Sequence, residues 1–148
     1  DIVKKLRGRY PVMPAIVMTG GFASEDTVFK ALALGDGTVT AVGMCRAPMA
    51  AAMNSAAVGK MLDAGNVPEH LKKYGSSVQE IFGDLPDLRA IYGTDADNFS
   101  PGAIGTFSYL RKIAFGLQHF AALNRKFDIS LLDRSDLIPL TPQAKELL

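Results

Sequence analysis

The chain has very little cysteine: Cys45 is the only one among its 148 residues. A single cysteine excludes a disulfide within the chain, and it excludes a zinc or iron–sulfur site built from the chain's own cysteines. A lone thiol is typical of a reducing compartment and no signal peptide is visible, so we expect a cytoplasmic location. At Cys45 itself we expect a small filler in a tight turn rather than a reactive group.

Long hydrophobic runs and an excess of one charge are also missing. The run of small apolar residues over 47–59 is broken by Asn54 and Ser55, and the apolar stretch over 103–123 carries two basic residues at its centre. Neither is typical of a membrane span. Lysine and arginine number 16 against 15 for aspartate and glutamate, which leaves a net charge of +1. This balance favours neither nucleic acid nor a membrane as a partner.

What the chain does have is an ordinary globular composition, 48% hydrophobic and 21% charged. The length suits one domain that can bury a core. Both ends nevertheless interrupt helical patterns, because residues 1–9 resemble the tail of a helix and the last helix begins only at Thr141 and Pro142. We therefore expect a segment of a longer protein. A segment with uncovered edges and helix faces is expected to self-associate.

Residues 1–65 have the pattern helix, strand, helix, strand, helix. Short β-branched runs at 15–19 and 38–42 predict two strands, the first buried on both faces, and glycine ends each of them. A helix with Ser24 as its N-cap and Gly35 as its end lies between them. Two strands joined through a helix by short turns predict a parallel βαβ unit. The expected fold class is therefore α/β.

Residues 66–148 predict a helical extension. Proline and glycine recur every few residues over 66–100 and leave room only for short helices. Ser100 and Pro101 then predict the start of a long helix that runs to about residue 124. Its apolar residues recur at steps of four and three, which predicts one buried face. The members of that face are Ala103, Phe107, Leu110, Ala114, Leu117 and Ala121, and it is widened by Ile104, Ile113 and Phe120, so that partners are expected on both flanks.

Two glycine-containing turns are the candidates for chemistry. Thr19-Gly20-Gly21 follows the first strand, and Gly43-Met44-Cys45-Arg46 follows the second. In a parallel βα array both turns lie at the carboxyl edge, where glycine lets a ligand approach the backbone and helix starts favour an anion. The Arg46 guanidinium matches a phosphate. The turns therefore predict a phosphate site, with tight structural turns and a structural arginine as the alternative.

Longer motifs give the chain a family resemblance. The stretch VFKALALG at 28–35 is similar to FMN-dependent hydroxyacid oxidases. The stretches RAPMAAAM at 46–53 and SDLIPLTP at 135–142 resemble the FMN-binding domain of glutamate synthases, in particular the shorter glutamate-synthase-like proteins that lack a full glutaminase. The resemblance implies the last two βα units of an FMN-dependent (β/α)8 TIM barrel within 1–65, followed by the helical extension over 66–148.

The resemblance also implies how the FMN phosphate would be held. The residues that it places there are Gly20, Gly21, Gly43 and Met44 through backbone N–H groups, and Arg46 through its side chain. Arg46 stands three residues after Gly43, whereas hydroxyacid oxidases have an arginine directly after that glycine. The three-iron cluster of larger glutamate synthases cannot be built with one cysteine.

By the same resemblance the whole protein is an oxidoreductase that reduces 2-iminoglutarate to L-glutamate. The segment alone is expected to be inactive, and no catalytic residue is named in it, because the flavin ring and the substrate would lie on other strands. The implied partners are the remainder of the barrel and a glutaminase or electron-donor subunit. Another FMN barrel oxidoreductase, of hydroxyacid oxidase or isomerase type, and a non-enzymatic helical interaction module stay open as alternatives.

Other residues that could carry chemistry have simpler interpretations. His119 is expected to be a packing or interface residue, and His70 has no partner at metal-ligand spacing. The acidic turn over 95–98 lacks the glycine and glutamate of a calcium loop and predicts a capping turn. Four methionines are expected to fill the core rather than to contact a cofactor. These are Met44, Met49, Met53 and Met61.

Overall fold

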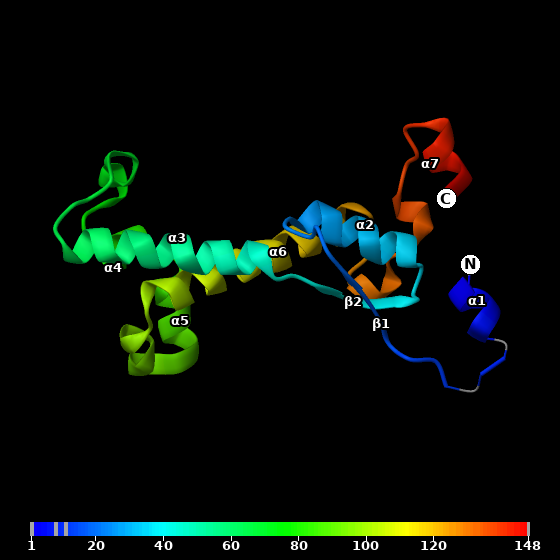
Figure 1. The fold of residues 1–148 in the computed structure, drawn as a ribbon, viewed down its shortest axis with the longest axis horizontal. Coiled ribbons are helices and arrows are strands. Elements are labelled where there is room, and N and C mark those ends of the chain that lie inside the picture. The colour runs from blue at the N-terminus through cyan, green and yellow to red at the C-terminus, as the bar shows by residue number, and fades with distance from the viewer. Residues whose placement is uncertain (1, 8, 11, 148) are drawn as a thin grey trace. The chain divides into compact units, whose positions relative to one another are not determined.

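The computed structural model describes residues 2–7, 9–10 and 12–147 of the chain. The chain divides into two compact units, Asp1–Met44 together with Ile113–Leu148, and Cys45–Lys112. These bounds differ from the expected segments 1–65 and 66–148, since the long helix α6 (Pro101–Leu123) begins in the second unit and ends in the first. Figure 1 gives the element labels.

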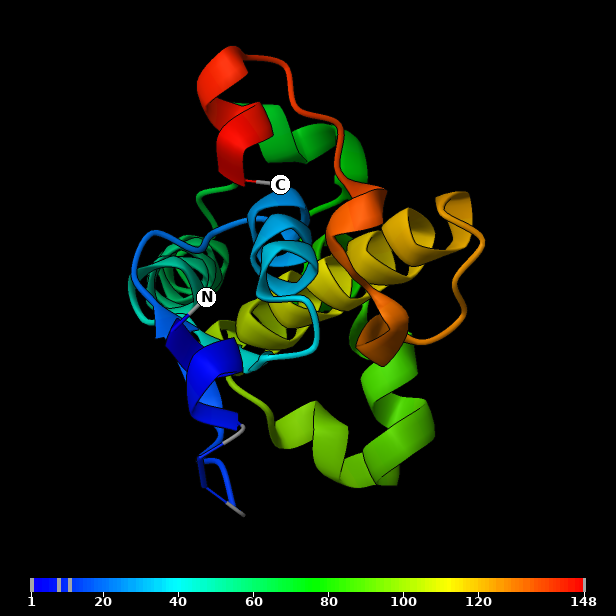
Figure 2. The same cartoon turned by 90° about the vertical axis from the view of Figure 1, so that its right-hand side faces the viewer.

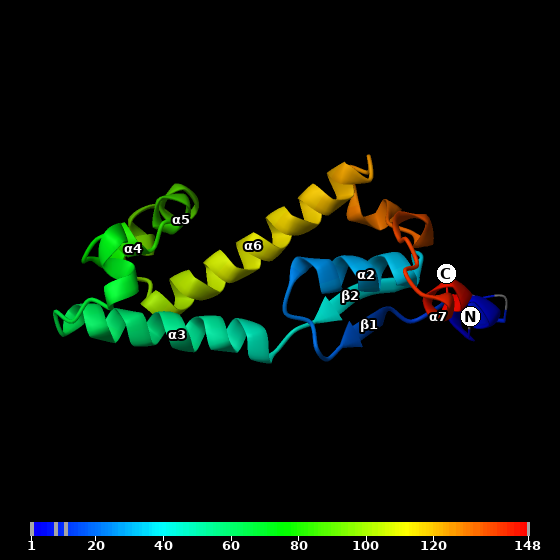
Figure 3. The same cartoon turned by 90° about the horizontal axis from the view of Figure 1, so that it is seen from above.

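The first unit holds both expected strands. β1 (Ile16–Thr19) and β2 (Val39–Gly43) pair in parallel, and α2 (Glu25–Gly35) connects them and contacts β2 (Figure 3). A short helix, α1 (Ile2–Arg7), precedes β1. The predicted α/β class and the parallel pairing are confirmed. The register pairs are Ile16 with Val39, Val17 with Ala41, Met18 with Val42, and Thr19 with Gly43.

The ends of α2 lie where the sequence predicts them, for partly different reasons. Ser24 is the N-cap, but its hydroxyl bonds the Asp26 carboxylate instead of a backbone N–H. The left-handed residue after the helix is Asp36, at φ 50°, and not Gly35. Gly35 is needed because a Cβ there would lie 2.6 Å from the Cβ of Val39. Close contact with β2, rather than a glycine cap, fixes this position.

The core of the first unit lies between α2, α6 and the segment after α6. Phe29 and Ala33 of α2 are buried with Ala121 of α6 and with Leu132. The Phe29 ring lies 5.4 Å from that of Phe120, in a tilted arrangement. Figure 2 shows the orange 3-10 turns η3 (Ile129–Leu131) and η4 (Arg134–Asp136) beside α2.

The expectation that the first strand is buried on both faces is wrong. Val17 is 52% exposed and Met18 is 40% exposed. Adjacent strand residues point to opposite faces, so both faces of β1 are open among the described residues. The β-branched run predicts a strand correctly, but burial requires neighbours on both sides, and this sheet has two strands.

The second unit is helical. α3 (Arg46–Asp63) lies against the first half of α6, and the two backbones approach closely through glycine. A Cβ at Gly102 would lie 3.0 Å from the carbonyl oxygen of Ala52. The shorter elements are η1 (Glu69–Tyr74), α4 (Val78–Ile81), α5 (Leu85–Tyr92) and η2 (Gly93–Asn98). The core residues of this unit are Leu85, Leu88, Ala96 and Ile104.

Two expectations about buried helix faces need correction. Met49, Met53 and Met61 are exposed and do not fill a core. On α6, the buried hydrophobic residues are Ile104, Ile113 and Ala121, with Phe107 and Leu117 half-buried. The other members of the predicted stripe are exposed, and these are Ala103, Leu110 and Ala114. Burial thus favours the widening residues Ile104 and Ile113, and Ile104 lies in one core cluster with Leu85 and Leu88 of α5.

The starts of the last two α-helices agree with the sequence. The Ser100 hydroxyl accepts the Ala103 N–H at 3.3 Å and begins α6 as predicted. The Thr141 hydroxyl accepts the Ala144 N–H at 3.1 Å ahead of α7 (Pro142–Leu147). Among the residues that the structure describes, none of the helices is long and apolar enough to span a bilayer.

Candidate phosphate-binding turns

The two candidate turns follow neighbouring strands. β1 and β2 run parallel, and their last register pair joins Thr19 to Gly43. The turn that starts at Gly20 and the turn that starts at Met44 therefore leave the sheet at the same edge (Figure 3). The expected adjacency of Gly20, Gly21, Gly43 and Met44 is present within the first unit.

The first turn presents open backbone. Gly20 has φ 98° and Gly21 has φ 78°, a left-handed conformation that glycine adopts without strain. A Cβ built on either residue would meet no atom within 4 Å. Two successive residues thus leave space in which a ligand can approach the main chain. This open cradle fits a phosphate held by backbone N–H groups.

Gly43 has a different reason to be glycine. A Cβ there would lie 2.8 Å from the Cγ2 atom of Thr19 on the neighbouring strand. Its backbone φ lies outside the left-handed region. The missing side chain is therefore explained by packing across the strand pair. Sequence reasoning missed Thr19, whose role becomes visible only once the register is known.

The charges beside the first turn come from the start of α2. The Asp26 carboxylate accepts a hydrogen bond from the Ser24 hydroxyl and forms an ion pair with the Lys30 ammonium at 3.1 Å. These contacts lower the Asp26 pKa. Glu25 is half-buried against α6, since a Cβ at Gly116 would collide with its side chain. Residues 20–27 contain no basic side chain. Any attraction for an anion at this turn therefore comes from backbone N–H groups.

The other candidate residues are placed as follows. Arg46 is the exposed first residue of α3 and belongs to the second unit, so its contact with a phosphate stays a prediction. Cys45 is exposed at the N-cap position of α3, and the expectation of a small filler is wrong there. His70 and His119 are exposed. In the described part of the chain, no three His, Cys, Asp or Glu side chains are grouped as for a metal ion.

A cavity in the first unit lies at the opposite end of β2 from the glycine turns. It has a volume of about 230 Å³ and is lined by Thr38 and Val39, where β2 begins. Leu34 at the end of α2 and Arg134 of η4 also line it. Met18 of β1, two residues before Gly20, lines it as well, but the lining includes none of the candidate phosphate residues.

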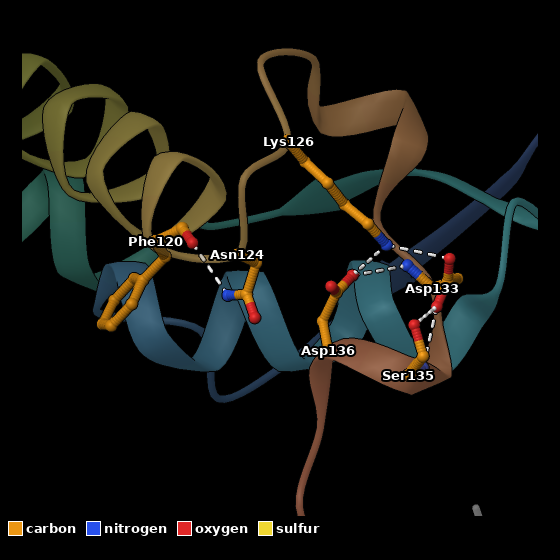
Figure 4. A network of polar contacts seen from close by, with 6 residues as sticks. All are labelled: Phe120, Asn124, Lys126, Asp133, Ser135 and Asp136. Carbon is orange, nitrogen blue, oxygen red and sulfur yellow. Dashed lines mark hydrogen bonds and ion pairs between the residues drawn. The ribbon is translucent and has the colours of Figure 1, made fainter.

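A polar network lies after α6 (Figure 4). The Lys126 ammonium donates to Asp133 at 2.8 Å and to Asp136 at 2.7 Å. Only 19% of the Lys126 side chain and 5% of the Asp136 side chain are exposed. Hydrogen bonds from Lys126 and Ser135 lower the Asp133 pKa to about 2, and the two carboxylates raise the pKa of Lys126. The network is structural, because it fastens η4 to the end of α6.

The end of α6 contributes one more contact to this view. The Asn124 side-chain amide donates to the Phe120 carbonyl at 2.9 Å.

Comparison of the chain with protein-family models, curated proteins and solved structures gave no match.

Proposed function

We propose that the chain is the carboxyl-terminal part of an FMN-binding (β/α)8 barrel of the glutamate-synthase type. Its role would be to hold the FMN phosphate at the turns after β1 and β2. The whole protein would reduce 2-iminoglutarate to L-glutamate, together with the remainder of the barrel and a glutaminase or electron-donor subunit. The family part of this proposal rests on the sequence resemblance.

One observation carries the proposal. The parallel pairing of Thr19 with Gly43 brings two βα turns to the same sheet edge, and the first turn holds two left-handed glycines with open space beside them. Phosphates in barrels are frequently bound at the turns after the last two strands.

The chain's own residues would act by binding and orientation. Backbone N–H groups at Gly20 and Gly21 would donate to phosphate oxygens, and the N-terminus of α2 would add its partial positive charge. FMN, when bound, supplies the hydride-transfer chemistry. The described chain provides no group that we assign to a proton transfer, so we name no catalytic residue.

The test compares two glycines with similar left-handed backbone conformations. Gly21 has φ 78° and Gly37 has φ 68°, and a Cβ at either meets no atom within 4 Å. Gly37 precedes β2 and lies at the other end of the strands. In the protein at its natural full length, Gly21→Ala should lower the FMN content at least about tenfold, because its methyl group occupies the phosphate approach. Gly37→Ala should keep the FMN content.

Thermal unfolding of both variants provides the control. Each substitution places alanine in a left-handed conformation and should cost about 1 kcal/mol. Equal losses of FMN would assign the effect to backbone strain and would contradict the phosphate site. A protein without any bound flavin would overturn the cofactor itself. Flavin reduction by 2-hydroxy acids, with no turnover of 2-oxoglutarate plus ammonia or glutamine, would favour a hydroxyacid oxidase.

A further inference from the structure

We draw no further inference here: the strongest candidate, the cavity of about 500 Å³ between the loop after α3 and η1, carries none, because Lys72, the only charged side chain among the described residues that line it, is 57% exposed and already pairs with Glu69, so nothing in the structure shows which ligand the cavity would hold.

Discussion

Lys126 holds together the polar network that follows α6. Its ammonium group bonds two carboxylates that stand three residues apart, and Asp136 has only 5% of its side chain exposed. The same carboxylate of Asp136 accepts the Asp133 N–H at 2.9 Å, which closes a capping box at η4. Removing the lysine would leave this shielded carboxylate without its cation.

Acid titration should reveal this network. The Asp133 pKa is lowered to about 2 in the folded chain, from 3.8. Its contribution to the free energy of unfolding is therefore complete above about pH 4 and is lost as the pH falls toward 2. Lys126→Met keeps the aliphatic stem and removes the charge. We expect a lower midpoint of thermal unfolding at pH 7 and a shallower loss of stability between pH 4 and 2.

Lys72→Met is the matched control for the Lys126 substitution. Lys72 pairs with Glu69, but 57% of the lysine and 87% of the glutamate side chain are exposed. Exposed pairs contribute little, so the control should unfold like the wild type at both ends of the pH range. An unchanged acid limb in Lys126→Met would show that the network does not stabilise the fold.

The sequence alone does not show why a given position requires glycine. Gly20 and Gly21 were expected to provide open backbone, and their φ angles and free surroundings agree. Gly43 carried the same expectation, but the methyl group of Thr19 explains it. The sequence shows that a side chain is missing, while only the strand register shows what would occupy its place.

Helix α6 depends on glycine where it meets α3. A Cβ at Gly105 would collide with the side chain of Ser55 and would lie 3.2 Å from the Ala51 carbonyl oxygen. On an exposed helix, glycine to alanine gains about 1 kcal/mol of helix propensity. Here the collision costs about 1–3 kcal/mol and should win. Gly105→Ala is therefore expected to lower the free energy of unfolding by about 1–2 kcal/mol, measured by urea denaturation.

Gly83→Ala is the matched control for Gly105→Ala, because it makes the same substitution at a position without close neighbours. Gly83 has no atom within 4 Å of an added Cβ, and it is exposed between α4 and α5. Its free energy of unfolding should stay within about 0.5 kcal/mol of the wild type. Stabilisation by Gly105→Ala would mean that α3 and α6 do not approach as closely as described.

At the scale of elements, capping residues and periodicity predicted where helices begin and end. Ser100 and Pro101 marked the start of α6, and Gly35 marked the end of α2. Periodicity did not predict which side of a helix is covered. Ile104 and Ile113, which widen the predicted α6 stripe, are buried, whereas its members Ala103 and Leu110 are exposed. Burial depends on which elements pack nearby, and local sequence does not contain that information.

At the scale of the whole molecule, β1 has the sequence of a buried strand in an exposed setting. Parallel strands with continuous apolar runs normally carry neighbours on both edges and helices on both faces. Val17 and Met18 point to opposite faces, and both are exposed in the described sheet of two strands. The proposed barrel would supply the missing neighbours, since closure of the sheet removes its edges.

Cysteine labelling should test this burial in the protein at its natural full length. With Cys45→Ser as the background, Val17→Cys and Met18→Cys should each react at least about tenfold more slowly than in the denatured protein, because further strands and helices would cover both faces. The control is Cys45 in the wild-type chain, whose thiol is exposed and should react rapidly. Rapid labelling at both positions would mean that β1 stays uncovered, and a closed barrel would then be contradicted whatever the flavin content.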